Sequence, residues 1–263
     1  MVFNKNIKGE ANEVEFVKFL DKKNIYELNP MFSSFIYDLF GCVDDNAIIR
    51  CYKNSKKQKS DIFIHINDIK KGISIKKGVK NSVHVEGISD FINFLLENGV
   101  SKTTINEYLK YHYADGTTNG TGKIRLSCLE YKRQHQEKVD LINLELNKKE
   151  LLLNAIDRFV LLGRNSNKKI DAILFGVVND FIWIKSDDII KVILKHQNDY
   201  STAVHFGPLT CQPMNRCINR NPLYEKERFC VQLKWYNLVD DIIWNMNDNC
   251  YLNQNMCCEE NDC

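Results

Sequence analysis

Residues 59–66 read KSDIFIHI, and residues 72–78 read GISIKKG. Both runs are rich in β-branched residues and predict strands, while the polar residues 67–71 between them predict a turn. In an antiparallel hairpin, Asp61 at the start of the first strand lies beside Lys76 at the end of the second. A carboxylate next to an ammonium group can bind a divalent cation and stabilise a developing negative charge, and phosphodiester hydrolysis needs both. The hairpin therefore predicts a hydrolytic site at one end of a sheet.

Strand alternation decides which side chains accompany this pair. Ser74 and Lys76 are two residues apart and share one face of the second strand. On the first strand His65 shares the face of Asp61 and Phe63, where we favour packing, or support of a catalytic side chain, over catalysis itself. The alternative interpretation is that Asp61 only caps a strand and that Lys76 is an ordinary surface lysine.

The composition is that of an ordinary globular protein, with 44% hydrophobic and 27% charged residues among 263. A chain of this length can bury one substantial core, so a single domain with insertions is predicted. No apolar run is long enough to cross a bilayer, and the N-terminus lacks the apolar core of a signal peptide. We therefore expect a cytoplasmic protein with no membrane partner.

The charge distribution says more than the net charge of +2. Residues 53–80 contain nine lysines against the two acids Asp61 and Asp68. Such a run can be a solvated edge hairpin, because lysines protect exposed strand edges from aggregation. It can also be a face that attracts phosphate groups around the predicted site.

Ten cysteines raise the question of a metal site. The spacings of Cys211, Cys217 and Cys230, with His205 nearby, match no zinc finger, ribbon or knuckle. Without a secretion signal, reduced thiols are expected. The last four cysteines belong to a polar segment, residues 246–263, that is typical of a disordered tail.

The remaining periodicity indicates a mixed α/β protein with helices bracketing a sheet. Strands are predicted at residues 46–52, 170–178, 181–184 and 229–235. Helices are predicted at residues 9–23, 30–40, 88–97, 103–113 and 187–196, and residues 130–162 read as two helices broken near Asn147.

The order of these elements resembles the catalytic core of the PD-(D/E)XK nuclease superfamily, and the type II restriction endonucleases within it. Ser60-Asp61 stands where the family has its Pro-Asp half, and Ser74-Ile75-Lys76 stands where it has (Asp/Glu)-x-Lys. The pair Gly9 and Glu13 resembles the N-terminal helix signature that supplies an additional carboxylate. The resemblance covers roughly residues 5–98 and implies a restriction-endonuclease-like core, a mixed central sheet flanked by helices, with a helical insertion at about 100–163.

The resemblance also implies roles for single residues. Asp61 and Glu13, or less favourably Glu10, would bind magnesium (Mg2+) together with the Ile75 carbonyl and water. Lys76 would orient or help to deprotonate the attacking water and stabilise the pentacovalent phosphate. Ser74 stands where the family has a second metal-binding acid, and serine is a weak ligand for a hard cation.

A second stretch, residues 205–221, is dense in amide and guanidinium groups. Such groups suit the base edges of the major groove, although they can equally satisfy the backbone of a structured loop. Similarity to the C-terminal part of several type II restriction endonucleases favours base readout or phosphate clamping. The predicted nucleic-acid-binding residues are Lys77, Lys80, Gln212, Asn215, Arg216, Asn219, Arg220 and Lys234. The Gly-Thr loop at 115–122 is a second candidate for phosphate contacts.

Together these observations predict one nuclease domain over residues 1–245, with strand and DNA-recognition elements at about 165–245. The predicted function is magnesium-dependent, sequence-specific cleavage of double-stranded DNA by a homodimer, because cutting both strands of a short palindrome calls for two sites. A separate DNA methyltransferase is a possible functional partner. Two alternatives stay open, a structure-selective repair or junction nuclease, and a catalytically inactive DNA-binding protein that Ser74 favours.

Overall fold

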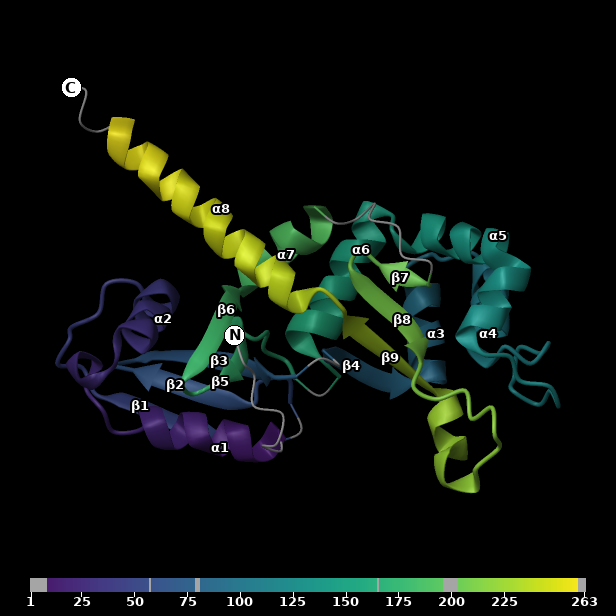
Figure 1. The fold of residues 1–263 in the computed structure, drawn as a ribbon, viewed down its shortest axis with the longest axis horizontal. Helices are drawn as coiled ribbons and strands as arrows, with labels where there is room; N and C mark the ends of the chain where they lie inside the picture. Colours follow the sequence, from purple (N-terminus) through teal and green to yellow (C-terminus); the bar gives the residue numbers. More distant parts are fainter. Residues whose placement is uncertain (1–8, 57, 79–80, 165, 196–202, 260–263) are drawn as a thin grey trace. The chain divides into compact units, whose positions relative to one another are not determined.

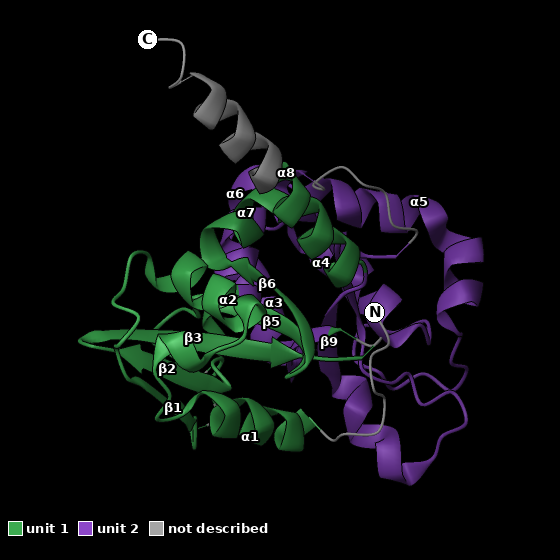
Figure 2. Ribbon diagram, turned by 60° about the vertical axis from the view of Figure 1, so that its left-hand side comes forward, with its two compact units in different colours: residues 1–81, 161–192, 237–263 green, residues 82–160, 193–236 purple. Residues whose placement is uncertain are grey.

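The structure is a computed structural model that describes residues 9–56, 58–78, 81–164, 166–195 and 203–259, with side chains described as far as residue 248. The chain divides into two compact units, coloured separately in Figure 2. Unit 1 comprises residues 1–81, 161–192 and 237–263, and unit 2 comprises residues 82–160 and 193–236. That residues 1–245 act as one nuclease domain stays a prediction. Each unit is built from separated stretches of chain.

Unit 1 is built on a five-stranded mixed sheet in the order β1-β2-β3-β5-β6. The strands are β1 (Ile49–Lys53), β2 (Ile62–Ile66), β3 (Ile69–Lys76), β5 (Ala172–Val177) and β6 (Asp180–Lys185). Only the β3–β5 pair within this sheet is parallel. Each of these strands overlaps a run that the alternation of the sequence predicted, and β5 lies in the interior of the sheet as its apolar character indicates.

The hairpin of β2 and β3 is tighter than the sequence suggested. Strand β3 begins at Ile69, paired with Ile66, so only Asn67 and Asp68 form the turn. Asn67 has a φ of 52°, the left-handed region that asparagine tolerates better than most residues. The short turn fixes the register, so that Phe63 pairs with Gly72 and Ile62 with Ile73.

Helices α1 (Gly9–Leu20) and α2 (Pro30–Phe40) lie beside this sheet in Figure 1, with the short 3-10 helix η1 (Ile25–Glu27) between them in the chain. The side chain of Asn29 caps α2 by accepting a hydrogen bond from Phe32 N at 3.0 Å. Phe16, Leu20, Phe32 and other aromatic and aliphatic side chains of both helices form one buried cluster with Ile62, Ile64 and Ile66 of β2. Burial of this face is the main stabilising contribution to unit 1.

Two further helices complete unit 1. Helix α7 (Ser186–Lys195) begins directly after β6 and belongs to unit 1 as far as residue 192, and α8 (Leu238–Glu259) contacts β6. The sequence predicted a disordered tail from residue 246, whereas α8 continues to Glu259. Residues 260–263 of that predicted tail lie outside the described part of the chain.

Unit 2 contains a second, antiparallel sheet in the order β4-β9-β8-β7. Its strands are β4 (Ser82–Gly87), β7 (His205–Phe206), β8 (Leu209–Pro213) and β9 (Cys230–Trp235). The sequence predicted only β9. The helices of this unit are α3 (Ile88–Glu97), α4 (Lys102–Tyr113), α5 (Cys128–Leu146), α6 (Lys149–Ala155) and the 3-10 helix η3 (Pro222–Phe229), while the π-helical turn η2 (Ile156–Leu162) spans the boundary with unit 1.

The predicted break near Asn147 is confirmed, because α5 ends at Leu146 and α6 begins at Lys149. Ser127 and Glu130 form a capping box at the start of α5, which explains why the helix begins before the predicted residue 130. Within the described residues, no helix is both long enough and apolar enough to span a bilayer.

Candidate active site

The end of the β2–β3 hairpin holds the predicted catalytic pair. Asp61 directly precedes β2 and donates its backbone N–H to Ile73 O at 2.8 Å, which sets it opposite the residues that end β3. A Cβ atom on Gly72 would lie 2.4 Å from Ser60 Oγ and 3.2 Å from Ser60 Cβ, so a larger residue at this position would force Ser60 to shift. The backbone thereby brings one carboxylate to the side of Ser74 and Lys76.

All described polar contacts of the Asp61 carboxylate involve one oxygen, Oδ2. It accepts hydrogen bonds from Ile75 N at 2.6 Å and Ser74 Oγ at 3.2 Å, and it lies 3.8 Å from Lys76 Nζ. The side chains of Asp61 and Lys76 are 25% and 20% exposed, and Ser74 is fully buried. The prediction that Asp61, Ser74 and Lys76 converge therefore agrees with the geometry.

Lys59 is a member of this site that the sequence analysis did not single out. Its pKa is lowered to about 7, first by burial and then by the positive charge of Lys76, against the opposite effect of Asp61. Its aliphatic stem packs over Gly163. The lysine-rich run contained Lys59, but nothing in the run distinguished it from its neighbours.

Glu13 and Glu10 occupy a different position from the one predicted. Lys53 Nζ lies 2.8 Å from Glu10 Oε1 and 3.2 Å from Glu13 Oε2. Lys53 pairs with Ile62, whose side chain belongs to the cluster with α1, and strand alternation places Asp61 on the other face. Within the described residues, the two glutamates contact Lys53 and make no contact with Asp61 or Lys76.

The residues around Asp61 offer few ligands for a magnesium ion. The described residues contain no group of three or more His, Cys, Asp or Glu side chains arranged to hold a metal ion. Asp61 Oδ1 makes no hydrogen bond or ion pair to the described residues, and the Ile75 carbonyl belongs to the residue whose N–H donates to Asp61 Oδ2. Magnesium is often bound by one or two carboxylates completed by water and substrate phosphates, and one free carboxylate oxygen and one carbonyl are compatible with that kind of site.

The predicted nucleic-acid-binding residues of unit 1 are not displayed as expected. The ammonium group of Lys77 is buried and has no hydrogen-bond partner among the described residues. Lys80 lies outside the described residues.

In unit 2, Arg216 differs most from its predicted role. It is 7% exposed, and its guanidinium donates to Tyr111 O at 2.6 Å and to His112 O at 3.4 Å. The group also lies 5.0 Å from the ring centroid of Tyr111. Arg216 thus supports the protein backbone, and its head is not presented to a DNA base.

The other predicted residues of unit 2 are divided between turns and strands. Asn215 Oδ1 accepts a hydrogen bond from Cys217 N at 2.8 Å, a local turn contact. Asn219 and Arg220 are exposed at the tip of the same turn, where Arg220 has a φ of 55°. Gln212 and Lys234 are half-buried on β8 and β9. Among the described members of the predicted set, Asn219 and Arg220 are the two exposed side chains.

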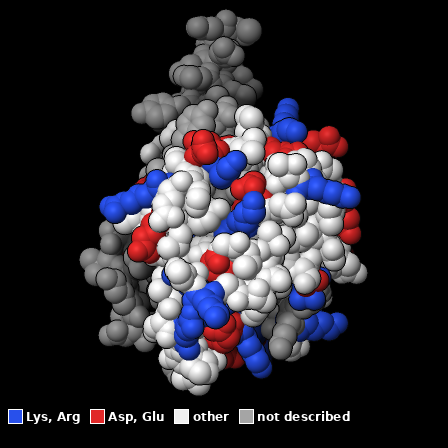
Figure 3. Space-filling view, turned by 90° about the vertical axis from the view of Figure 1, so that its right-hand side faces the viewer, with Lys and Arg blue, Asp and Glu red and all other residues white. Residues whose placement is uncertain are grey.

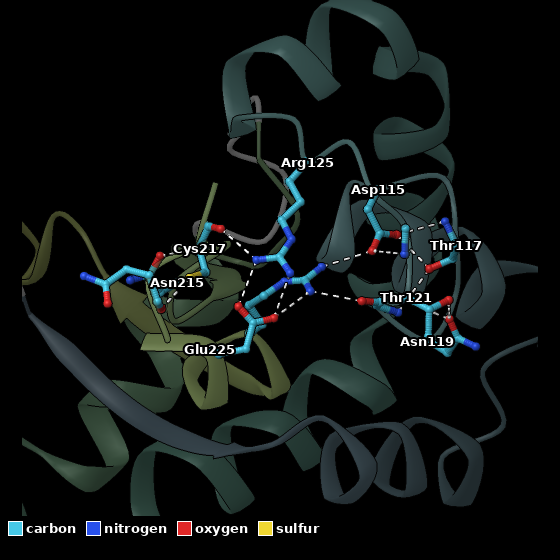
Figure 4. Close-up of polar contacts among 12 residues, drawn as sticks. Asp115, Thr117, Asn119, Thr121, Arg125, Asn215, Cys217 and Glu225 are labelled. Carbon is cyan, nitrogen blue, oxygen red and sulfur yellow. Dashed lines mark hydrogen bonds and ion pairs between the residues drawn. The ribbon is translucent and has the colours of Figure 1, made fainter. Parts of the chain in front are cut away.

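The Gly-Thr loop is folded on its own polar groups (Figure 4). Asp115 Oδ1 accepts from the backbone and hydroxyl of Thr117, and its Oδ2 accepts from Gly122 N. Asn119 Oδ1 holds Thr121 in the same way. Backbone amides at Thr117, Thr121 and Gly122 are therefore not free for phosphate.

A chain of charges ties this loop to the turn and helix that follow β8 (Figure 4). Arg228 bonds Asp115 at 3.0 Å and Glu225 at 3.2 Å, and Arg125 binds Glu225 through two hydrogen bonds. Hydrogen bonds from Arg125, and then from Arg228, lower the pKa of Glu225 to about 2. Burial alone would raise the pKa of Asp115, but hydrogen bonds from Thr117, Arg228 and Gly122 outweigh it and lower the value. Loop 115–125 and residues 215–228 are thus cross-linked, a pairing that the sequence did not reveal.

Acid should weaken unit 2 through His112, whose ring lies 2.7 Å from Arg228 O and is 1% exposed. Burial, together with the charges of Arg216 and Arg228, lowers its pKa to about 4, against the effect of its hydrogen bond. The unfolded chain takes up this proton near pH 6.5 and the folded chain only near pH 4, so stability falls as pH decreases between these values. We expect this residue to account for a loss of about 3 kcal/mol, at 1.36 kcal/mol per pH unit.

Urea denaturation of the protein and of a His112→Gln variant between pH 7.5 and pH 4 measures this effect. The difference in unfolding free energy between the two should shrink by about 3 kcal/mol on acidification. A difference independent of pH would mean that His112 is not held neutral by its surroundings.

The face of the molecule in Figure 3 carries Lys and Arg interspersed with Asp and Glu. Long-range attraction of a polyanion needs a field of one sign, and this face does not provide one.

Comparison with known proteins adds one kind of likeness. Neither a protein-family model nor a curated protein sequence matches the chain. Among solved structures, the crystal structure of the restriction endonuclease MspI in complex with its cognate DNA is similar, with a TM-score of 0.53 and 13% sequence identity over 86% of this chain and 88% of that chain. The protein therefore has the mixed α/β, restriction-endonuclease-like fold that the sequence predicted.

Proposed function

We propose that this protein is a magnesium-dependent nuclease that cuts double-stranded DNA at specific sequences, as a type II restriction endonuclease does. The observation that carries the proposal is the meeting of Asp61, Ser74 and Lys76 at one end of the β2–β3 hairpin. The restriction-endonuclease-like fold supports it, since the similar MspI structure was solved with DNA.

Each residue of the hairpin has a task in this proposal. Asp61 Oδ1 and the Ile75 carbonyl would hold magnesium, which when bound polarises the scissile phosphate and makes a water molecule more acidic. Ser74 and Ile75 N fix the orientation of the carboxylate through its other oxygen. Lys76 directs its ammonium to the same space, where it orients the attacking water and offsets the charge that develops on the phosphate.

Glu13 is the candidate for a second carboxylate. Its ion pair with Lys53 lies on the face of the sheet opposite Asp61, so Glu13 would reach a cation at Asp61 only if that pair opens and the side chain moves around the end of the sheet. Glu10 is 82% exposed and is the weaker candidate, because its carboxylate is held by solvent and Lys53. The proposal therefore assigns the primary metal contact to Asp61 alone.

For recognition of the base sequence, the proposal relies on unit 2. Asn219 and Arg220 are accessible, and amide and guanidinium groups can read base edges in the major groove. Gln212 and Lys234 are half-buried on strands β8 and β9 and would make DNA contacts closer to the sheet. Cleavage of both strands of a palindrome favours a homodimer, and a separate methyltransferase would protect the same sites in the cytoplasm.

A second candidate function follows from Ser74 and from the fact that, among the described residues, Asp61 alone forms an ion pair with Lys76. A protein with this site that binds metal too weakly would recognise DNA without cutting it. A nuclease that selects branched DNA remains a third possibility, which the accessible amides of unit 2 do not favour.

Incubation of plasmid DNA with the protein, with magnesium or with EDTA, separates these functions. We expect discrete fragments with magnesium and intact plasmid with EDTA, because the hydrolysis depends on the cation. Retarded but uncut plasmid would favour the non-catalytic DNA-binding protein. Cutting restricted to branched substrates would favour the junction nuclease.

A further inference from the structure

A pocket of about 380 Å³ opens in unit 1 beside Ser60, the residue before Asp61. Its lining includes the aromatic rings of Tyr52 and Phe63 and four lysines, together with serine and amide side chains. The lysines are Lys53, Lys56, Lys70 and Lys168. No Asp or Glu is among the described residues that line it. Lys53 is paired with Glu10 and Glu13, whereas Lys56, Lys70 and Lys168 make no ion pair with the described residues, so these three lysines suit the pocket to an anion.

The register of the sheet aligns this pocket with the candidate active site. Tyr52 pairs with Phe63, and Arg50, His65 and Lys70 form the next row across β1, β2 and β3. Phe63 and His65 are two and four residues beyond Asp61, so alternation places all three on one face. At about 3.3 Å per residue, the basic row formed by Arg50, His65 and Lys70 lies about 13 Å along the strand from Asp61.

Lys70 is held in place without being neutralised. Its Nζ lies 3.8 Å from the ring centroid of Phe63 and 5.4 Å from that of Tyr52, which are cation–π distances. Within the described residues Lys70 makes no ion pair, whereas the adjacent Lys71 is paired with Asp171 at 3.2 Å. Lys168 donates to Lys70 O at 3.3 Å, which adds a second ammonium at the same place.

The pKa of His65 is affected by the positive charges around it. Burial lowers its pKa, and the charges of Lys70, Arg50 and Lys168 lower it further. Its Nε2 lies 3.0 Å from Tyr52 Oη, and no acidic side chain is among the causes of the shift. A neighbouring anion would reverse the part of this shift that the three cations produce.

We propose that the basic row, with Lys168, binds backbone phosphates of the DNA strand that extends from the scissile bond along this face of the sheet. The inference rests on the proposed function for the identity of the ligand as DNA. Lys70 and Lys168 supply the direct phosphate contacts, and the rings of Tyr52 and Phe63 form the floor between them and Asp61. These contacts carry no base information, so they set affinity and register and leave sequence preference unchanged.

Fluorescence anisotropy with a labelled DNA duplex, in EDTA and over a series of salt concentrations, tests this site. Each phosphate contact contributes about 0.9 to the slope of log K against log salt. We expect Lys70→Ala and Lys168→Ala each to lower the slope by about 0.9, and the double variant by about 1.8. Lys18→Ala removes an exposed lysine of α1 in the same unit and should leave the slope unchanged.

A second readout does not depend on affinity. We expect the pKa of His65, followed by NMR, to rise when the duplex binds, and to be raised already in free Lys70→Ala. A general loss of folding would not produce that pattern.

The outcomes separate this proposal from the nuclease proposal. If Lys70→Ala and Lys168→Ala show the same slope of log K against log salt as Lys18→Ala, the phosphate site is overturned, even if the protein cuts plasmid. Lowered slopes with uncut plasmid support the phosphate site and remove the nuclease. A protein that binds no duplex overturns both.

Discussion

Replacement of Lys76 by alanine should lower the rate of DNA cleavage about a thousandfold, while DNA affinity measured in EDTA changes little. The ammonium of Lys76 lies 3.8 Å from Asp61 Oδ2, where it can face both the attacking water and the phosphate. Its removal takes away a charge that acts mainly in the transition state, so the loss should appear in kcat and only slightly in KM. Single-turnover cleavage of a duplex containing the target sequence measures this directly.

Two control variants show whether the loss of activity is specific to Lys76. Lys18→Ala removes a lysine from α1 of the same unit and should cut at the parental rate. Asp61→Asn keeps the shape of the side chain and its contacts with Ser74 and Ile75 N, but weakens its hold on a cation. We expect it to need a higher magnesium concentration and to remain slow even then. If Lys76→Ala cuts at the parental rate and keeps its thermal stability, the active site lies elsewhere.

The fold of unit 1 could be predicted because its signals are local. Alternation along β2 and β3 and the apolar run of β5 each declare a strand within a few residues. These local patterns do not predict that β3 pairs in parallel with β5, which lies about a hundred residues further along the chain. That pairing, and the assembly of each unit from separated stretches of chain, follow from packing between distant parts of the chain.

The second sheet escaped prediction for a different reason. Strand β8, with the sequence LTCQP, carries a glutamine and a proline and follows a glycine and another proline, so its composition indicates a loop. Strand β8 forms because it pairs with β9, where Gln212 lies opposite Gln232 and Pro213 opposite Val231. Pairing that arises from a partner strand is invisible in the strand's own composition.

The sequence predicted which backbone segments form the candidate site better than it predicted which charged side chains pair there. Asp61, Ser74 and Lys76 lie within one hairpin, so turn length and alternation suffice to bring them together. Glu13 was expected at the cation, but the side chain that engages it, Lys53, lies forty residues away on β1. Arg216 has a composition typical of DNA contacts, yet carbonyls of α4 more than a hundred residues away bury it. Side chains whose partners are distant in sequence cannot be assigned from local pattern.

Replacement of Arg228 by methionine should destabilise unit 2 by about 3–5 kcal/mol, because it leaves a buried carboxylate without its counter-charge. The side chains of Arg228 and Asp115 are 1% and 0% exposed, so the Asp115 charge has no access to solvent. The same guanidinium also donates to Gly120 O at 3.0 Å, so the loop loses a second anchor. Arg125→Met is the matched comparison. Its partner Glu225 is 39% exposed and can be solvated, so we expect a loss of only about 1 kcal/mol.

Urea unfolding followed by the fluorescence of Trp235, a buried residue of β9, measures this loss in a background where Trp183 and Trp244 are replaced by phenylalanine. Adding Asp115→Asn to Arg228→Met should recover part of the stability, because the double variant no longer buries an unpaired charge. If loops 115–125 and 215–228 act as one recognition element, Arg228→Met should also weaken discrimination between the target sequence and others at temperatures where unit 2 remains folded. A loss no greater than that of Arg125→Met, with no recovery in the double variant, would show that the buried pair does not hold these loops together.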